Sequence, residues 1–319
     1  MTNFNHKKFK SLTDFIIGIT EEIWENRQIQ SILEYYSNDV IVRSPEGVVH
    51  GNKKVVDATH ATLYEFPNRE LLGEDVIWCK NKEGSYLSSH RILSKATHLN
   101  DGVYGKAKKR DVVYRVIADC HVNNGIIDDE WLVRDQGAIV RQLGYQPKQF
   151  ILSKLENSSS NKTYNFLSRK NNPVGPYIGR GNTNKYGKKF EIILKQIMNF
   201  ELSSIKKTYD RSVQIEFPSH KTGHSYSSVE KFWMQIRESF PSSKFRIDHI
   251  IGIEDDNMYP RASIRWVLDG KHDGDGYFGK PTGKDVYILG ISHVEFRNNL
   301  IIREFTLFDE LVIWEQILN

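Results

Sequence analysis

Apolar residues in the first 70 positions recur every three to four residues, the spacing of helices that bury one face. One such face runs through Phe15, Ile19 and either Ile23 or Trp24, in a segment that Thr13 can cap. The spacing predicts three helices before any extended sheet: one beginning after Thr13, a short one near 31–36, and one over 52–66.

From residue 70 onward the pattern changes to runs rich in β-branched and aromatic side chains, which indicate strands. A brief strand at 40–45 precedes the third helix, and Asn124-Gly125 has the composition of a two-residue hairpin turn. Helices followed by consecutive strands predict an α+β domain, in which the helices cover one face of a bent antiparallel sheet. The four longer strands are expected at 70–79, 86–96, 111–122 and 126–136.

The second half of the chain repeats this order. Placing each residue beside the one 174 positions later aligns 50–144 with 224–318 without a gap, and 21 of the 95 pairs are identical. Chance would give roughly one identical pair in sixteen. An earlier pair of segments, "YYSNDVIVRSP" and "TYDRSVQIEFP", aligns one residue out of step. The chain is therefore a tandem duplication, and we expect two domains related by an approximate two-fold axis, like the subunits of a homodimer.

A segment rich in Ser, Asn, Gly, Pro and Lys separates the repeats. It predicts a first domain at 1–145, a basic linker at 146–189 that straps across the domains, and a second domain at 190–319. The linker holds nine Lys or Arg against one acidic residue, whereas the remainder of the chain carries a net charge of −4. Because the basic residues are not on a folded domain, this distribution argues against a nucleic-acid partner.

Composition narrows the class of protein further. With 39% hydrophobic and 26% charged residues the chain has the composition of a soluble globular protein, and no stretch approaches the roughly 20 apolar residues of a membrane span. Cys79 and Cys120 are too few for a disulfide framework and lack metal-binding spacing. The N-terminus has only a short apolar run and makes a poor signal peptide. We therefore expect a cytoplasmic protein with no membrane partner.

The glycine-rich segment "DGKHDGDGYFGKPTGKDV" (269–286) invites comparison with phosphate and metal loops. A phosphate-binding loop needs a Lys-Ser or Lys-Thr pair, but Lys284 is followed by Asp285. The acidic residues fall short of a calcium loop, and no H-E-x-x-H or G-x-S-x-G motif occurs. Because "THLNDGVYGKAKKRDV" (97–112) is its counterpart, we expect a hairpin connection that both halves need, and no metal site.

Several motifs resemble those of the SnoaL-like polyketide cyclases and ester cyclases. They are "RWVLDGKHDGDGYFGKPTGK" (265–284) with "EFTLFD" (304–309), and "NNGIIDDEWLVRDQGAIVRQLG" (123–144) in the first repeat. The resemblance implies two tandem cone-shaped domains, each with three helices packed on a curved antiparallel sheet around an apolar pocket. This is the cystatin-like or nuclear-transport-factor-2-like fold. It also implies chemistry without a cofactor, on a small organic substrate.

In that family an Asp on the last strand moves the proton, and this role maps onto Asp135 and Asp309. Alternation supports the assignment, since it places Asp135 on one face with Trp131 and Val133, and Asp309 with Phe305 and Leu307. Burial in an apolar cavity would raise the pKa of such a carboxyl towards the range useful for a base. The competing interpretation is that each Asp caps the helical turn that follows it. The family's second titratable group maps onto His121 in the first repeat and His293 in the second.

Matched residues complete the candidate substrate pocket. His98 and His272 lie beside the hairpin connections, where a turn-stabilising hydrogen bond is the competing role. Arg91 and Arg265 could bind an anionic substrate group or pair with an acid across the sheet. The full set expected to line the pockets is Trp24, Trp131, Val133, Arg91, His98, Arg265, His272, Phe305 and Leu307.

Two classes of function follow from these patterns. The first is an enzyme that performs acid–base chemistry, either an aldol-type ring closure or an isomerisation, on a small organic substrate. The second is a non-catalytic binder or scaffold whose duplication forms an intrachain pseudo-dimer, with a further homo-oligomer possible. An enzyme needs a carboxylate facing the cavity with a second polar group in reach, whereas a scaffold shows it turned outward or the cavity filled by aromatic rings.

Overall fold

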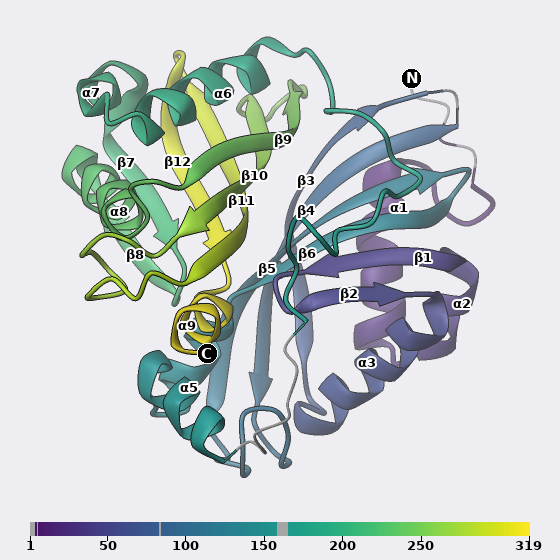
Figure 1. Cartoon of the computed structure of the whole chain (residues 1–319). Helices are drawn as coiled ribbons and strands as arrows, with labels where there is room; N and C mark the ends of the chain where they lie inside the picture. The colour runs from purple at the N-terminus through teal and green to yellow at the C-terminus, as the bar shows by residue number, and fades with distance from the viewer. Residues whose placement is uncertain (1–3, 5, 83, 158–164) are drawn as a thin grey trace.

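The computed structural model describes residues 4, 6–82, 84–157 and 165–319, and shows one six-stranded sheet in each half of the chain (Figure 1). Domain 1 contains α1 (Leu12–Thr20), the π-helical turn η1 (Glu21–Glu25), η2 (Ile29–Ser31), α2 (Ile32–Tyr35), β1 (Tyr36–Ser44), β2 (Gly47–His50), α3 (Asn52–Glu65), β3 (Glu70–Lys80), β4 (Ser85–Thr97), β5 (Asp111–Asn123), β6 (Ile126–Arg134) and α4 (Gln136–Gln142). α5 (Pro147–Glu156) follows.

Domain 2 repeats the order. It contains α6 (Lys185–Met198), η3 (Leu202–Ser204), α7 (Ile205–Thr208), β7 (Tyr209–Phe217), β8 (Lys221–His224), α8 (Ser225–Ser239), β9 (Lys244–Ile253), β10 (Arg261–Lys271), β11 (Asp285–Arg297), β12 (Leu300–Phe308) and α9 (Glu310–Leu318). The predicted α+β class and the tandem arrangement are confirmed.

The sheets have the orders β2-β1-β6-β5-β4-β3 and β8-β7-β12-β11-β10-β9. The four long strands of each half pair antiparallel, as predicted, but β1 pairs parallel with β6, and β7 pairs parallel with β12. No hairpin joins either of these two pairs, so no turn constrains their relative direction. Both sheets are therefore mixed, and the expectation of a wholly antiparallel sheet was wrong at one pairing in each domain.

Local signals explain where the elements begin and turn. Asn124 and Gly125 both have positive φ, at 50° and 79°, as a tight hairpin turn between β5 and β6 requires. α1 is capped by Ser11, whose hydroxyl accepts from the Asp14 backbone N–H at 3.1 Å, and not by Thr13 as expected. Ser11 satisfies the same capping preference two residues earlier, so the helix starts ahead of the predicted position.

The two sheets face each other across the domain boundary, while α1–α3 and α6–α8 lie on their far sides (Figure 1). Ser89 and Ser263 are equivalent positions of the repeats, and their hydroxyls lie 2.9 Å apart. A residue that contacts its own counterpart marks the axis of an isologous interface.

Reciprocal contacts surround that axis. The Arg265 guanidinium of domain 2 stacks 3.6 Å from the ring centre of Trp131 in domain 1. The equivalent Arg91 of domain 1 stacks 3.6 Å from the ring centre of Phe305 in domain 2. Each arginine therefore covers the aromatic residue of the opposite domain, as the expected two-fold relation requires.

The connecting segment follows this boundary (Figure 1). Leu167 is 1% exposed and belongs to a hydrophobic cluster shared by both sheets. Arg43 of β1 donates to the Asn172 side chain at 2.8 Å and to the Pro173 carbonyl at 2.9 Å. Tyr177 donates its backbone N–H to Asp129. The described part of the connection thus binds domain 1 on its way to domain 2, although 158–164 lie outside the described residues.

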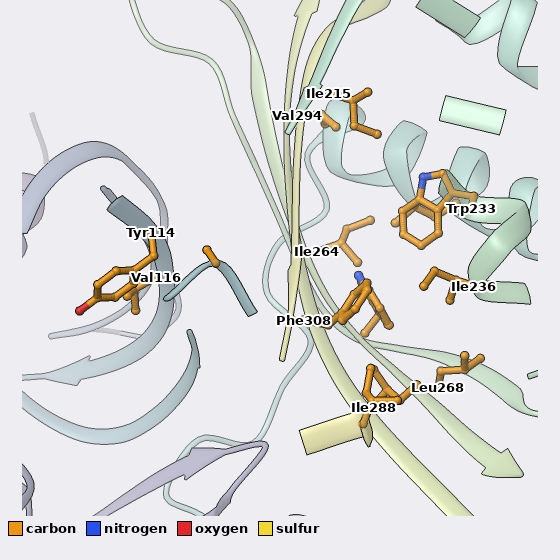
Figure 2. Packing of buried hydrophobic residues seen from close by; sticks show 14 of the residues in the cluster. Tyr114, Val116, Ile215, Trp233, Ile236, Ile264, Leu268, Ile288, Val294 and Phe308 are labelled. Carbon is orange, nitrogen blue, oxygen red and sulfur yellow. The ribbon is translucent and has the colours of Figure 1, made fainter. Parts of the chain in front are cut away.

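The interiors of the two cones differ. In domain 2, Trp233, Trp266, Phe240 and Phe308 are at most 2% exposed and fill the space between α8 and the sheet. Figure 2 shows this packing, with Trp233, Ile236, Ile264, Leu268 and Phe308 together on the domain 2 side, while Tyr114 and Val116 lie on the domain 1 side. In domain 1 the corresponding space is a cavity.

Candidate functional site

The domain 1 cavity has a volume of about 750 Å³ and lies between the helices and the sheet. Its helical wall includes Ile16 and Ile19 of α1, Trp24 of η1 and Thr59 of α3. Two wall positions explain why the space is open. Thr59 and Ile92 stand where domain 2 has Trp233 and Trp266, so two indole rings are replaced by much smaller side chains. A cavity of this size accommodates a small organic molecule.

Five buried polar atoms along this cavity have no hydrogen-bond partner among the described residues. Buried polar groups are otherwise almost always paired, because leaving one unpaired costs about 1–3 kcal/mol. These five are among 14 such atoms in the described residues, and a ligand or solvent in the cavity can pair them. The five are Arg69 Nε, His90 Nε2, Tyr114 Oη, Glu130 Oε2 and Arg134 Nε.

Glu130 projects into the cavity from the middle of β6. Burial raises the pKa of its carboxyl to about 7, although the nearby Tyr36 hydroxyl and Cys120 thiol oppose that rise. Tyr36 and Cys120 also line the cavity, and burial raises the pKa of both of these groups well above their ordinary values. The carboxyl of Glu130 can therefore gain or lose a proton near neutral pH, whereas its two neighbours stay protonated.

The repeat provides an internal comparison for Glu130. Its counterpart Glu304 accepts hydrogen bonds from the Tyr209 hydroxyl at 2.7 Å, the Trp233 indole N–H at 3.2 Å and the Thr306 hydroxyl at 2.7 Å. In domain 1 the positions of Trp233 and Thr306 hold Thr59 and Leu132, and no hydrogen bond reaches Oε2 of Glu130 from the described residues. The same carboxyl is thus a fully paired core group in one domain and an open one in the other.

His90 adds a neutral group to the same cavity. Burial lowers the pKa of its imidazole to about 3, and the charge of neighbouring Arg91 lowers it further in the same direction. The ring is therefore uncharged at neutral pH, and its Nε2 has no partner among the described residues. Domain 2 has Ile264 at the equivalent position. The polar character of this wall is a property of domain 1.

Asp135 lies outside this cavity, at the end of β6 and against domain 2. Its carboxylate accepts from three backbone N–H groups: Ala138 of α4 at 3.0 Å, and Ser219 and His220 of the β7–β8 turn at 2.8 and 3.0 Å. Burial raises the pKa of Asp135 to about 6 in spite of these bonds. Asp135 therefore caps α4, as the competing interpretation expected, and it also hydrogen-bonds to the backbone of domain 2.

Asp309 occupies the equivalent place at the start of α9, where Oδ1 accepts from the Leu311 N–H at 3.0 Å. Its Oδ2 accepts from the Gln136 side chain at 2.6 Å, and the residue reaches the edge of the domain 1 cavity. Burial raises the pKa of this carboxyl well above its ordinary range. Domain 2 thus contributes one residue to the lining of the domain 1 cavity.

The candidate histidines lie on the face of each sheet away from its cone. His121 is 2.6 Å from the Ser85 hydroxyl and 2.5 Å from an Asp128 carboxylate oxygen, and it stacks on Tyr177 of the connecting segment. His293 lies 2.7 Å from the Ser89 hydroxyl at the domain boundary. Neither lines the domain 1 cavity.

The candidate arginines also lie at the boundary between the domains. Arg265 donates to Asp119 at 2.8 Å, and Arg91 donates to Glu74 at 3.1 Å. Of the two roles considered for these arginines, the structure shows the pairing with an acid. The other acids near Arg91 are Asp75, at 4.0 Å, and Glu295, at 3.9 Å.

The remaining candidate pocket residues divide between the two faces. Trp24 lines the domain 1 cavity. Trp131 stacks with Arg265, whereas Val133, Phe305 and Leu307 meet at or beside the contact between the sheets. His98 lies 3.0 Å from Glu65 at the end of α3, and His272 lies 3.2 Å from the Thr282 hydroxyl in the glycine-rich connection.

Sequence alternation grouped Trp131, Val133 and Asp135 on one face, and the structure confirms that grouping. Alternation does not say which of the two faces lines the cavity, and here Glu130, Leu132 and Arg134 do so. The signal that could have shown this is a comparison of the repeats. Some cavity positions change from polar to apolar between them, such as His90 to Ile264 and Arg134 to Phe308, although Glu130 is matched by Glu304. At the boundary, Ser89, Arg91 and Asp135 have identical counterparts in Ser263, Arg265 and Asp309.

Within the described part of the chain, no group of three or more His, Cys, Asp or Glu side chains is arranged to hold a metal ion. Among the same residues, no helix has the length and apolar character needed to cross a membrane.

No protein-family model and no curated protein matches the sequence. Among solved structures, the chain is similar to a SnoaL-like polyketide cyclase from Agrobacterium tumefaciens, with 15% identity over 42% of this chain and 98% of that one and a TM-score of 0.33. It is also similar to IdmH from Streptomyces antibioticus, whose role as a polyketide cyclase is a proposed assignment, with 18% identity, the same coverage and a TM-score of 0.36.

A nuclear-transport-factor-2-like protein of unknown function from Burkholderia pseudomallei is a third similar structure. It is 14% identical over 40% of this chain and 95% of its own, with a TM-score of 0.32. Each of the three therefore spans less than half of this chain and nearly all of its own length. These proteins include members of the family that the sequence motifs resemble.

Proposed function

We propose that domain 1 is an enzyme of the polyketide-cyclase or ester-cyclase type, and that Glu130 is its base. The observation that carries this proposal is the Glu130 carboxyl, which has a pKa near 7 and an unpaired oxygen in an apolar cavity of about 750 Å³. A base works best when its pKa is close to the operating pH, so that it is both ionised and strong enough to take a proton.

The chemistry follows from the strength of this base. A carboxylate of moderate basicity removes a proton only from an acidic C–H, such as one between two carbonyl groups. The resulting enolate carries its charge on oxygen, where the unpaired Nε2 of neutral His90 and the protonated Tyr36 hydroxyl are the polar groups available in the cavity wall. Attack of the enolate carbon on a second carbonyl closes a ring, and return of the proton at another position completes an isomerisation. Neither outcome needs a cofactor.

The alternative function, a non-catalytic scaffold, is the one that the features of domain 2 support. Its cone is filled by Trp233, Trp266 and Phe240, and its equivalent carboxyl Glu304 is fully hydrogen-bonded. We propose that this domain supports domain 1 by covering the outer face of its sheet and by supplying Asp309 to the edge of the cavity.

The test is hydrogen–deuterium exchange at the activated carbon of ethyl benzoylacetate, followed by NMR. Wild-type protein should accelerate exchange over buffer, and Glu130→Gln should reduce that acceleration by at least about 100-fold, the scale of a positioned acid–base group. Glu304→Gln is the matched control and should retain it. Equal losses in both variants would refute Glu130 as the base, and binding of the ester without exchange would favour the non-catalytic binder.

A further inference from the structure

Two arginines line one end of the domain 1 cavity. Arg69 precedes β3 and is 5% exposed, and Arg134 is the last residue of β6. The positive charges are close enough that Arg134 contributes to lowering the pKa of Arg69, after the larger effect of burial. Tyr114 of β5 lies at the same end, with its hydroxyl unpaired among the described residues.

Neither guanidinium has a carboxylate in direct contact. Burial opposes the charge of Arg134, but the nearby Tyr114, Tyr104, Glu46 and Asp309 side chains raise its pKa above the ordinary value. Among the described residues no carboxylate lies within 4.0 Å of Arg69 or Arg134, and Nε of each makes no hydrogen bond. Two other buried arginines do have a carboxylate partner: Arg265 pairs with Asp119, and Arg43 pairs with Asp129. A third, Arg237, donates to backbone carbonyls instead. Arg69 is buried and Arg134 is half-buried, and burying a charge without a carboxylate partner costs stability that an anionic ligand would offset.

The other acidic groups that line the cavity make no ion pair with either arginine. Glu46 is exposed to solvent. Glu65 accepts from the Val103 and Tyr104 backbone N–H groups at 3.0 Å and also contacts His98. Asp309 is occupied by Gln136 and by the N-terminus of α9, and Asp101 accepts from the Ala107 N–H at 2.8 Å. All four line the cavity, but none of them lies within 4.0 Å of either guanidinium, and Glu46 and Asp309 act on Arg134 only through their charge.

The repeat again supplies a comparison. Domain 2 has Ser243, Phe308 and Ile288 at the positions of Arg69, Arg134 and Tyr114. Phe308 and Ile288 belong to the packed interior of that domain (Figure 2). The fold therefore does not require a positive charge at either position, and the two arginines accompany the open cavity.

We propose that Arg69, Arg134 and Tyr114 bind a carboxylate group at one end of the ligand, an inference that rests on the proposed function of this cavity. A planar carboxylate can accept two parallel hydrogen bonds from each guanidinium edge, a geometry that a neutral ester or amide cannot reproduce. Glu130 lies four residues before Arg134 on the same strand, roughly 13 Å at about 3.3 Å per residue. The substrate class is therefore an elongated, largely apolar carboxylic acid whose reacting carbon lies about 10 Å from its carboxylate, within that spacing.

The test compares phenylhexanoic acid with phenylhexanamide, which have the same shape, by isothermal titration calorimetry on the full chain. The acid should bind about 10- to 100-fold more tightly than the amide, the range expected for hydrogen bonds to a charged group. Arg69→Met and Arg134→Met should each remove most of that difference, and Tyr114→Phe should remove a smaller part. Arg110→Met is the matched control, because Arg110 is exposed, lies in the same domain and does not line the cavity.

Thermal unfolding without ligand distinguishes this role from a structural one. Because burial lowers the pKa of Arg69 and no carboxylate lies within 4.0 Å of it, Arg69→Met should leave the melting temperature unchanged or raise it, whereas removal of a structural arginine would lower it. If acid and amide bind equally to wild type, the carboxylate inference is wrong while the cavity proposal stands. If neither binds, both fall. Lower melting temperatures with an unchanged preference for the acid would also overturn the inference.

Discussion

Glu130 links the site to the stability of the fold through its proton. The folded protein holds that proton up to about pH 7, whereas the unfolded chain releases it near 4.5. Glu130 therefore contributes stability that is fully present below about pH 4.5 and is lost as the pH rises through about 7. An open base in an apolar cavity thus makes domain 1 less stable at the pH at which it would act.

We predict that Glu130→Gln raises the melting temperature at pH 8 and leaves it nearly unchanged at pH 4. Glutamine is always neutral, so the variant avoids burying a charge; a shift from 4.5 to about 7 corresponds to about 3 kcal/mol at most. Thermal unfolding followed by circular dichroism at both pH values measures the difference. Equal melting temperatures for wild type and variant at pH 8 would show that Glu130 is not strained by its surroundings.

A second prediction concerns Asp135, whose carboxylate receives three backbone N–H groups from two domains. Asparagine would direct an NH₂ group at one of these donors, so Asp135→Asn should destabilise the protein by about 1–3 kcal/mol. Denaturant unfolding measures this, and Asp57→Asn on the exposed face of α3 is the control. A stable variant that has lost at least about 100-fold in turnover would instead support Asp135 as the base.

Single residues also show how far the sequence predicts the site. Strand alternation grouped Trp131 with Asp135 correctly, and Trp24 was placed on the cavity. Glu130 was passed over because both faces of β6 are buried, one by the cone and the other by domain 2, and hydrophobicity does not distinguish two buried faces. Arg69 and Arg134 were missed because their role depends on the absence of partners, which requires coordinates.

At the level of elements, the strands of the two domains pair in the same register, but different side chains occupy the interior of each cone. Trp266 of β10 lies opposite Gly290 of β11, and the equivalent pair in domain 1 is Ile92 and Val116. A Cβ atom added at Gly290 would lie 2.1 Å from the Trp266 ring. The glycine is therefore required by the indole that occupies the cone.

We predict that Gly290→Ala lowers the melting temperature, because the added methyl group forces the indole out of its packed position at a cost of about 1–3 kcal/mol. Trp266→Ile with Gly290→Val reproduces the domain 1 pair and should remove the clash, although it leaves a void where the ring was. Calorimetry on the single and double variants measures the coupling. A single variant as stable as wild type would show that the indole has room to move.

Helices and strands were predicted correctly where the local pattern of apolar residues and turn residues determines them. The four long strands of domain 1 and the helix over 52–66 begin and end within two residues of their expected limits. The parallel pairing of β1 with β6 was not foreseen, because it joins segments separated by the whole domain and leaves no turn in the sequence.

At the level of the whole molecule, the two domains meet at one interface, which contains both ion pairs and an apolar cluster. Arg115 of domain 1 donates to Glu216 of domain 2 at 3.0 Å, and Arg141 donates to Glu310 at 3.0 Å. Ile117, Ile291 and Leu307 form an apolar cluster between the sheets. Charged pairs shielded from water in this way are screened little by salt.

We predict that cutting the connection leaves the domains associated. A protease site inserted between residues 157 and 165 should yield two fragments that elute together in size-exclusion chromatography, even at high salt. This stretch overlaps 156–163, "ENSSSNKT", whose composition predicts an exposed segment that is cut first in limited proteolysis, although 158–163 lie outside the described residues. Phenylhexanoic acid should still bind, because the contacts around Gln136 and Asp309 do not depend on the covalent connection. Fragments that separate at low salt would contradict the interface described here.

The two positions beside the Ser89–Ser263 contact have a consequence for assembly. Ser89 donates to Asp119 at 2.5 Å and lies 2.7 Å from His293, and these two residues are equivalent in the repeats. A homodimer of domain 1 alone would place two aspartates around this point, and a homodimer of domain 2 alone would place two histidines there. Covalent fusion allowed the position to become unlike on its two sides. An aspartate on one side and a histidine on the other would disfavour pairing of either domain with a copy of itself, since that pairing would bring two like side chains together.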